Sequence, residues 1–468
     1  MKRKIPFAGM PLAVIFGLML GGCAVPMPDT GKLVGESLPH AWSVTVSGSE
    51  DNLEQFWERW NDPVLLSLLK KAVEANPDVT GALANLRSAR ASQLAATATL
   101  WPSASLGTSA DVRRQNHRTR DGYDANLQSD WTWNLAGADW ARADAKALRT
   151  LATEMTLEHT RNLVAAETAQ AYINYRVAEE KLAIAKANEE NLRKTAEVAV
   201  WRAESGMGEI SEKEDALQRL EIARARIPEI ESSIAGYRNA LARLTTVAAD
   251  RLELENTRGV PTAPNGIAVK IPAESLMRRH DVLGALRNLE AAAKELQAAR
   301  EDYFPSLGLH GSLGTTATSI GALGASGTGI ASLVGSLSLP VLNWGTLEAR
   351  EETASAELDR YKSTYVATIV NALEETDNAL QGIRSAETRE AMIRKANEHA
   401  EKSYEYASLE YQTGVGDYVT MLTAQNALLS ARESVVTNAA ERSNQYVMLY
   451  RAVGGAWQDE SDNAKRTE

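Results

Sequence analysis

Apolar residues recur every three or four positions along most of the chain, which is the pattern of amphipathic helices. The segment after Asp62 shows it clearly, because an Asp N-cap and Pro63 at the first helical position start a helix there. Its apolar positions are Val64, Leu65, Leu68, Leu69 and Val73. The pattern predicts helices at about 62–101, 138–205, 209–246, 274–302 and 418–452, with a further long arm that ends before Gly414.

Two gaps between these helices alternate apolar and polar residues instead. Leu127, Trp131 and Trp133 mark the first gap, and Leu333 and Leu337 mark the second. The period of two predicts two β-hairpins, at about 103–136 and 305–342, with first strands at 105–112 and 306–313 and loops at 113–126 and 314–330. Such segments are typical either of membrane β-barrel strands or of a soluble hairpin packed on helices. In a membrane barrel, Trp131 and Trp133 would lie in the interfacial aromatic girdle.

The chain contains an internal duplication. Residues 78–106 and 281–309 share 13 of 29 positions, and after an insertion the offset becomes 208. This offset pairs Gly206 with Gly414 and Gly208 with Gly416. A period of this length indicates a duplicated half of the molecule rather than a solenoid. We therefore expect a first repeat at 56–258 and a second repeat at 259–455, followed by a polar tail at 456–468.

Each repeat contains a short glycine-rich stretch between two helical arms, at 206–209 and at 414–417. Glycine adopts the left-handed backbone that ends one helix and turns the chain into the next. Each stretch is thus predicted to be the tip of a long helical hairpin. The longest arm, about 68 residues, would measure roughly 100 Å.

The N-terminus has the composition of a secretory leader. Lys2-Arg3-Lys4 precedes an apolar run of about 16 residues, which is short for a transmembrane helix. Leu20-Gly21-Gly22-Cys23 then resembles a bacterial lipobox, and Cys23 is the only cysteine in 468 residues. This predicts a signal peptide at 1–22 and a tether at 23–55 that carries diacylglycerol and an N-acyl chain on Cys23. No thiol remains for metal binding or disulfides.

Composition and motifs argue against several other functions. The net charge is −11 and no basic patch is apparent, so nucleic-acid binding is not expected. The six histidines are scattered, and no metal-ligand spacing, nucleophile elbow or phosphate-binding loop occurs. We therefore expect no enzyme activity, no metal and no cofactor other than the lipid.

Two hairpins supply only four strands, and four strands cannot close a barrel that spans a bilayer. Several subunits would have to share one barrel. The whole mature chain resembles the TolC/OprM-type outer-membrane efflux proteins, in their lipoprotein (NodT-like) branch. The resemblance is carried by Trp60-Asn61-Asp62-Pro63, Asn76-Pro77-Asp78-Val79, the two Pro-Ser helix exits, Trp133-Asn134-Leu135-Ala136-Gly137, and 410–418 continuing into Thr423-Ala424-Gln425.

The resemblance implies a mainly α fold with a membrane β-barrel part. Three protomers would share a twelve-stranded barrel in the outer membrane and a periplasmic α-barrel made of their helical hairpins. The implied function is passive export, as the outer-membrane channel of a tripartite efflux system. The implied partners are a periplasmic adaptor (membrane fusion protein), an inner-membrane transporter of the resistance-nodulation-division type, and outer-membrane lipid.

The resemblance also assigns roles to residues of the tips. The adaptor contacts fall on Gly206, Met207, Gly208, Gly414, Val415 and Gly416. The periplasmic gate falls on Val419, Thr420 and Thr423, where threonines replace the aspartates of the family, and Asp417 is a further candidate for the charge. The alternative to a channel is a lipid-tethered periplasmic coiled-coil scaffold.

Overall fold

The computed structural model describes residues 25–35, 39, 41–44, 56–115, 118–254, 259–263 and 276–455. Cys23 and the signal peptide lie outside these residues, as do most of the tether and the polar tail. The described chain forms two compact units, and each unit contains parts of both repeats. The long helices α5 (Ala138–Glu204) and α9 (Trp344–Thr413) contribute to both units.

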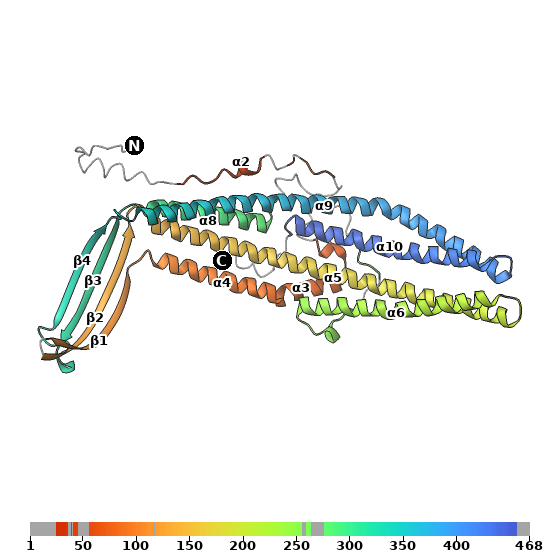
Figure 1. Ribbon diagram of the computed structural model, residues 1–468, viewed down its shortest axis with the longest axis horizontal. Helices are drawn as coiled ribbons and strands as arrows, with labels where there is room; N and C mark the ends of the chain where they lie inside the picture. Colours follow the sequence, from red (N-terminus) through yellow and green to blue (C-terminus); the bar gives the residue numbers. More distant parts are fainter. Residues whose placement is uncertain are drawn as a thin grey trace. The chain divides into compact units, whose positions relative to one another are not determined.

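The first unit contains a four-stranded antiparallel sheet in the order β1-β2-β3-β4 (Figure 1). The unit also includes the segments of α4, α5, α8 and α9 nearest in sequence to the strands. α4 spans Pro77–Ala98 and α8 spans His280–Glu301. The strands are β1 (Ser103–Gln115), β2 (Arg118–Asn134), β3 (Ser306–Ala317) and β4 (Gly329–Ser338).

The register gives the sheet one apolar and one polar face. Leu106, Leu127 and Leu313 share one row, and successive residues of a strand point to opposite faces. On the other face His310 Nδ1 lies 2.7 Å from Asp130 Oδ1. Gly314 allows β3 to approach β2, because a Cβ there would stand 2.7 Å from the Asn126 Cβ. The predicted alternation is therefore present in the sheet.

The predicted loop at 113–126 is wrong, because β1 and β2 extend through most of it. Arg113 is paired with Arg120, and Ala110 with Tyr123. Backbone pairing in a ladder does not require apolar side chains, so a polar stretch continues the hairpin. The second loop is also shorter than predicted: β3 continues to Ala317, β4 begins at Gly329, and the short 3-10 helix η4 (Ile320–Ala322) lies between them.

The predicted helix at 62–101 is two helices, α3 (Pro63–Ala75) and α4. Asn76 interrupts it with an extended backbone, at ψ 133°, because the residue before a proline is disfavoured in the helical region. The Asn76 side chain donates to the Leu244 carbonyl at 3.0 Å and accepts from the Asp78 amide at 2.8 Å. The Asn76 side chain thus caps α4 and joins the start of α4 to α6 within the second unit.

The second unit is built from helices around one apolar core. It contains the two helical hairpins, in which α5 pairs with α6 (Ile210–Thr245) and α9 with α10 (Tyr418–Ala452). Two short 3-10 helices, η2 (Glu58–Trp60) and η3 (Ala249–Arg251), also belong to this unit, whereas the short helix α2 (Thr30–Val34) belongs to the first. Phe56 stacks on Tyr450 at 4.6 Å, and Trp57 and Trp60 complete this aromatic cluster.

Asp62 joins α3 to this core. Its carboxylate caps α3 by accepting from the Val64 and Leu65 amides, each at 3.0 Å, and it accepts from the Tyr172 hydroxyl at 3.0 Å.

We expect Asp62→Ala to lower the free energy of unfolding by about 1–2 kcal/mol, because a lost N-cap leaves helix amides unsatisfied. The matched Asp62→Asn keeps a capping oxygen and should retain most of the stability. Urea unfolding followed by circular dichroism tests this, and equal midpoints for Asp62→Ala and wild type would contradict it.

Candidate functional site

The first hairpin tip is a glycine turn that exposes a methionine. Gly206 has φ +76°, and the amides of Met207 and Gly208 both donate to the Arg202 carbonyl, at 2.9 and 3.0 Å. The left-handed glycine closes the end of α5 in this way. The Met207 side chain remains 58% exposed. The tip therefore presents one flexible apolar side chain on a backbone that its own hydrogen bonds hold in place.

The second tip repeats this geometry. Gly414 has φ +80°, and the amides of Val415 and Gly416 donate to the Glu410 carbonyl at 3.0 and 2.9 Å. A Cβ on Gly416 would stand 2.8 Å from the Glu410 Cβ, so only glycine fits there. Val415 is 85% exposed. The predicted glycine positions thus make the turns, and Met207 and Val415 are the side chains that they present.

Asp417 is the N-cap of α10 and is exposed. Its carboxylate accepts from the Thr420 amide at 2.8 Å and from the Thr420 hydroxyl at 2.6 Å. Hydrogen bonds from the Thr420 side chain and backbone hold the pKa of Asp417 below its usual range. The structure therefore brings together two of the four proposed gate residues, and Asp417 stays ionised at neutral pH.

The other two gate candidates lie on the same first turns of α10. Val419 is exposed in the single chain, and so is Thr423, whose hydroxyl donates to the Val419 carbonyl at 2.8 Å. Because that bond lies within one helix, it leaves the hydroxyl oxygen of Thr423 able to accept from solvent. The four candidates form one exposed patch that has a single charge, two hydroxyls and the apolar Val419.

Sequence reasoning missed a polar link between the two hairpins. The buried Tyr411 donates its hydroxyl to Glu212, and the Arg202 guanidinium lies 5.1 Å from its ring centre. Burial is the main cause that raises the pKa of the Tyr411 hydroxyl, and the bond to Glu212 raises it further. Tyr418 packs against the apolar clusters of both hairpins. A signal was available, because the repeat offset aligns these tyrosines with Ala203 and Ile210, so the aromatic pair is confined to the second repeat.

Tryptophans gather where the sheet of the first unit meets its helices. Trp131 and Trp133 stack at 6.1 Å, and the Trp131 indole donates to the Leu100 carbonyl at 3.0 Å. Trp101 and Trp140, which the sequence reading did not single out, line the same cavity of about 210 Å³. Trp101 comes immediately before Pro102, and Trp140 lies three residues after Gly137 in the first turn of α5, so their closeness to the strand ends was the available signal. The cluster has the composition of an interfacial aromatic belt.

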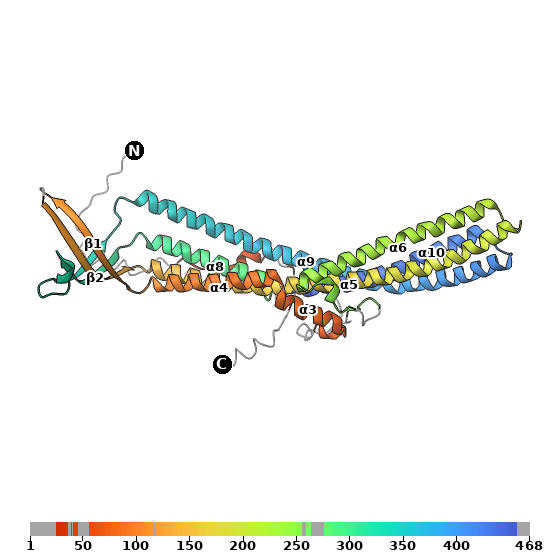
Figure 2. The same ribbon diagram turned by 90° about the horizontal axis from the view of Figure 1, so that it is seen from below.

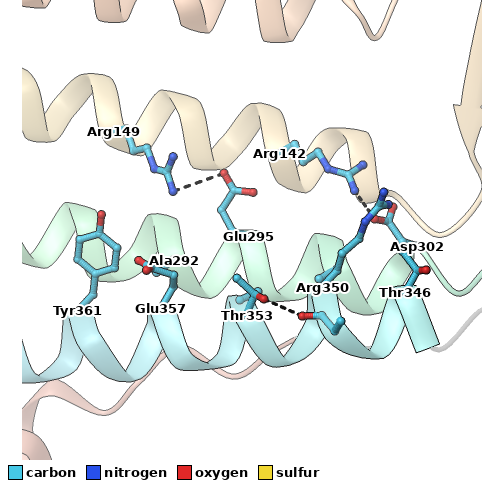
Figure 3. Close-up of a pocket in the computed structure, with 13 residues that line it drawn as sticks. Arg142, Arg149, Ala292, Glu295, Asp302, Thr346, Arg350, Thr353, Glu357 and Tyr361 are labelled. Atoms are coloured by element: carbon cyan, nitrogen blue, oxygen red, sulfur yellow. Dashed lines mark hydrogen bonds and ion pairs between the residues drawn. The ribbon is translucent and has the colours of Figure 1, made fainter. Parts of the chain in front are cut away.

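A larger cavity of about 690 Å³ lies among α5, α8 and α9 of the same unit (Figure 3). Arg142 pairs with Asp302, and Arg149 lies 3.6 Å from Glu295. Although burial opposes the charge, the bond to Asp302 raises the pKa of Arg142. Three arginines and three carboxylates line this cavity, and the third carboxylate, Glu357, is ion-paired with Arg360 at 2.6 Å. The arrangement is that of ion-paired helices rather than of an acid–base site.

A membrane-spanning helix and a metal site are both absent from the part of the chain that the structure describes. Over those residues no helix is both long and apolar enough to cross a membrane. The same residues bring together no group of three or more His, Cys, Asp or Glu side chains that would hold a metal ion.

Comparison with known proteins identifies the class of these hairpins and strands. Residues 68–247 and 271–455 match the outer membrane efflux protein family. The chain is 26% identical to the pyoverdine export outer membrane protein OpmQ of Pseudomonas putida, over 95% of this chain and 97% of that protein. It is 24% identical to nodulation protein T of Rhizobium leguminosarum bv. viciae, over 97% and 94%.

The fold agrees with this match. The solved structure of the outer-membrane channel OprN superposes with a TM-score of 0.82 at 25% identity, covering 90% of this chain and 99% of that one. The chain belongs to the outer membrane efflux protein family. The predicted family and fold class are confirmed, and so is the function as the outer-membrane channel component of a tripartite efflux system.

Proposed function

We propose that three copies of this chain assemble into one channel, anchored by lipid on Cys23, that receives substrate from a periplasmic adaptor and an inner-membrane transporter of the resistance-nodulation-division type. The open edges of the sheet support the proposal. β1 and β4 each pair on one side only, so their outer backbone groups have no strand partner among the described residues. A sheet in lipid must satisfy those groups by closing with further strands.

The two faces of the sheet support a barrel with a wet interior. One face carries leucines and the stacked Trp131 and Trp133, which lipid would cover. The other carries Asp130, His310 and serines such as Ser312, which water would cover. Conduction through such a barrel is passive, so the transporter supplies the energy and selects most of the substrate.

Ion conduction by the reconstituted chain tests the channel. We expect purified protein in planar bilayers to give discrete conductance steps and to cross-link as a trimer, since four strands per copy require partners. As a control, a deletion of residues 103–136 removes half of the sheet and should abolish the steps while leaving the second unit helical. A protein that passes no current and stays monomeric would instead be a tethered scaffold.

The tips are the surfaces we assign to the adaptor. Met207 and Val415 are exposed apolar side chains, and their glycine-defined backbones need little ordering on binding. Such pre-formed apolar knobs are typical anchors of protein interfaces.

Aspartate substitutions at the tips test the adaptor contact. We expect Met207→Asp and Val415→Asp to weaken adaptor binding about tenfold, because each buries a charge in an apolar contact. The controls Met207→Leu and Val415→Ile keep an apolar side chain and should bind as wild type does. Adaptor binding is measured by in vivo cross-linking, and unchanged conductance in bilayers shows that the channel itself is intact. Wild-type binding by both aspartate variants would remove the tips from the contact.

The gate proposal rests on Asp417 and the hydroxyls beside it. In a trimer each of these side chains appears three times around the pore, so three ionised Asp417 carboxylates would attract cations. Thr420 holds each carboxylate in place through its hydroxyl.

Alanine at Thr420 and Thr423 tests the gate. We expect higher closed-state conductance, because the pore loses hydroxyls and Asp417 loses its hydroxyl donor. The matched control is Thr413→Ala, since that exposed hydroxyl bonds only the carbonyls of its own helix, at 3.0 and 3.1 Å. Conductance in Thr420→Ala/Thr423→Ala that equals the control excludes both residues from the gate.

A further inference from the structure

Helices α6 and α9 each leave one face uncovered in the second unit. In both views they lie outermost among its four long helices, with α5 and α10 between them (Figures 1 and 2). The uncovered face of α9 carries Lys395, Lys402 and Tyr406. Tyr406 is 65% exposed, and the two lysines have no ion pair with any described residue.

The uncovered face of α6 carries the complementary set. Glu221, Glu214 and Ile210 are all exposed, and Ile210 is 74% exposed. Glu221 and Glu214 are seven residues apart, and Glu214 and Ile210 are four apart. Lys395, Lys402 and Tyr406 have the same two spacings, but they run toward the C-terminus where the first set runs toward the N-terminus. Two antiparallel helices would therefore bring both lysines to both glutamates and the tyrosine to the isoleucine. Glu221 also accepts from Arg224 of its own helix, but its side chain remains 68% exposed.

The packing inside the chain shows how two hairpins meet. α10 lies antiparallel against α5, and the side-chain amides of Asn444 and Gln425 donate to Asn174 and Asn188, both at 3.4 Å. The duplication makes α9 the equivalent of α5, and α6 the equivalent of α10. A ring of three copies alternates first and second hairpins. The same packing would then join α9 of one copy to α6 of the next.

The repeat also predicts the register of that contact. Shifted by 208 residues, the two amide contacts place Ala396 opposite Leu217 and Gly382 opposite Gly236. Counted along antiparallel helices, the first of these pairs puts Lys395 opposite residue 218 and the second puts it opposite residue 223. Glu221 lies within that range. The same alignment puts Lys402 beside Glu214 and Tyr406 beside Ile210.

Gly236 is an independent indication of the contact. It lies inside α6, and beyond the backbone of its own helix no described atom comes within 4 Å of the place where its Cβ would be. Glycine in a helix interior is unfavourable, so a close approach by another chain is a physical reason for it. In this register Gly382 of α9 lies opposite Gly236, but the Gln445 side chain of its own chain's α10 already fills the place of a Gly382 Cβ, so the open position is that of Gly236 alone.

We propose that the α9 face of Lys395, Lys402 and Tyr406 docks antiparallel on the α6 face of Glu221, Glu214 and Ile210 in a neighbouring copy. This docking surface rests on the proposed trimer and assigns its contacts near the tips. The charges lie at the rim of the contact, so they select partner and register and weaken with added salt. Because the surface is heterologous, three copies close it into a ring.

Charge reversal with rescue tests the register. Lys395→Glu/Lys402→Glu places like charges together and should lower the yield of cross-linked trimer about fivefold or more, as should Glu214→Lys/Glu221→Lys. All four changes in one chain restore opposite charges and should restore the trimer. The control Lys194→Glu makes one charge reversal of the same kind on α5, where the lysine pairs with Glu190 of its own helix. Failure of the fourfold variant to recover would overturn the pairing.

Disulfide trapping provides the second test. Chains carrying Ile210→Cys and chains carrying Tyr406→Cys, with different tags, are co-expressed and oxidised in membranes. We expect a disulfide-linked dimer that contains both tags. The control pairs Val198→Cys with Tyr406→Cys and should give no disulfide-linked dimer. Residue 198 is the repeat equivalent of residue 406, but it lies on α5 of the first hairpin and outside the proposed contact.

The outcomes separate this inference from the proposed function. A conducting trimer that never forms the 210–406 disulfide would keep the channel and overturn the docking surface. A wild-type chain that is monomeric and passes no current would overturn both.

Discussion

An antiparallel sheet of four strands leaves the outer N–H and C=O groups of β1 and β4 without a strand partner in the part of the chain that the structure describes. In water such an edge is tolerated, but in hydrocarbon each unpaired group costs several kcal/mol. The sheet also has one apolar and one polar face, as a sheet with lipid on one side and water on the other requires. The open edges make the single chain an incomplete unit, and the proposed assembly of three copies follows from that incompleteness.

The helices of a single chain are incomplete in a similar way, because the duplication gives them equivalent faces of which only one pair is covered. Each repeat supplies one strand pair and one helical hairpin, so one packing geometry serves within a chain and between chains. The buried contacts of α10 on α5 are present in the chain, whereas the equivalent faces of α9 and α6 remain exposed. On α9, Lys395 and Lys402 have no ion pair with a described residue, whereas Glu221 and Glu214 of α6 pair with Arg224 and Lys213 of their own helix. Gly236 is unfavourable inside a helix, and a neighbouring copy that covers it would offset that cost.

The sequence predicted most of the elements because their signals are local. Glycine at 206 and 414 adopts positive φ, and Asp62 caps α3, as expected from residue type alone. The loop at 113–126 was wrong because ladder pairing depends on the partner strand rather than on side-chain polarity. The break at Asn76 required reading Pro77 as a constraint on its predecessor. Tyr411 and Glu212 are 199 residues apart, so no local pattern could pair them.

The two tips share a turn but differ in chemistry, and the difference bears on function. Glu209 makes no side-chain cap on α6, whereas Asp417 caps α10 and keeps its charge. Tyr411 and Tyr418, which have no aromatic counterparts in the first repeat, join the second hairpin to the first. The two tips therefore share one backbone turn, while the second tip has polar links that the first lacks. Those links hold the end of the second hairpin to the first hairpin through a buried hydroxyl and a carboxylate.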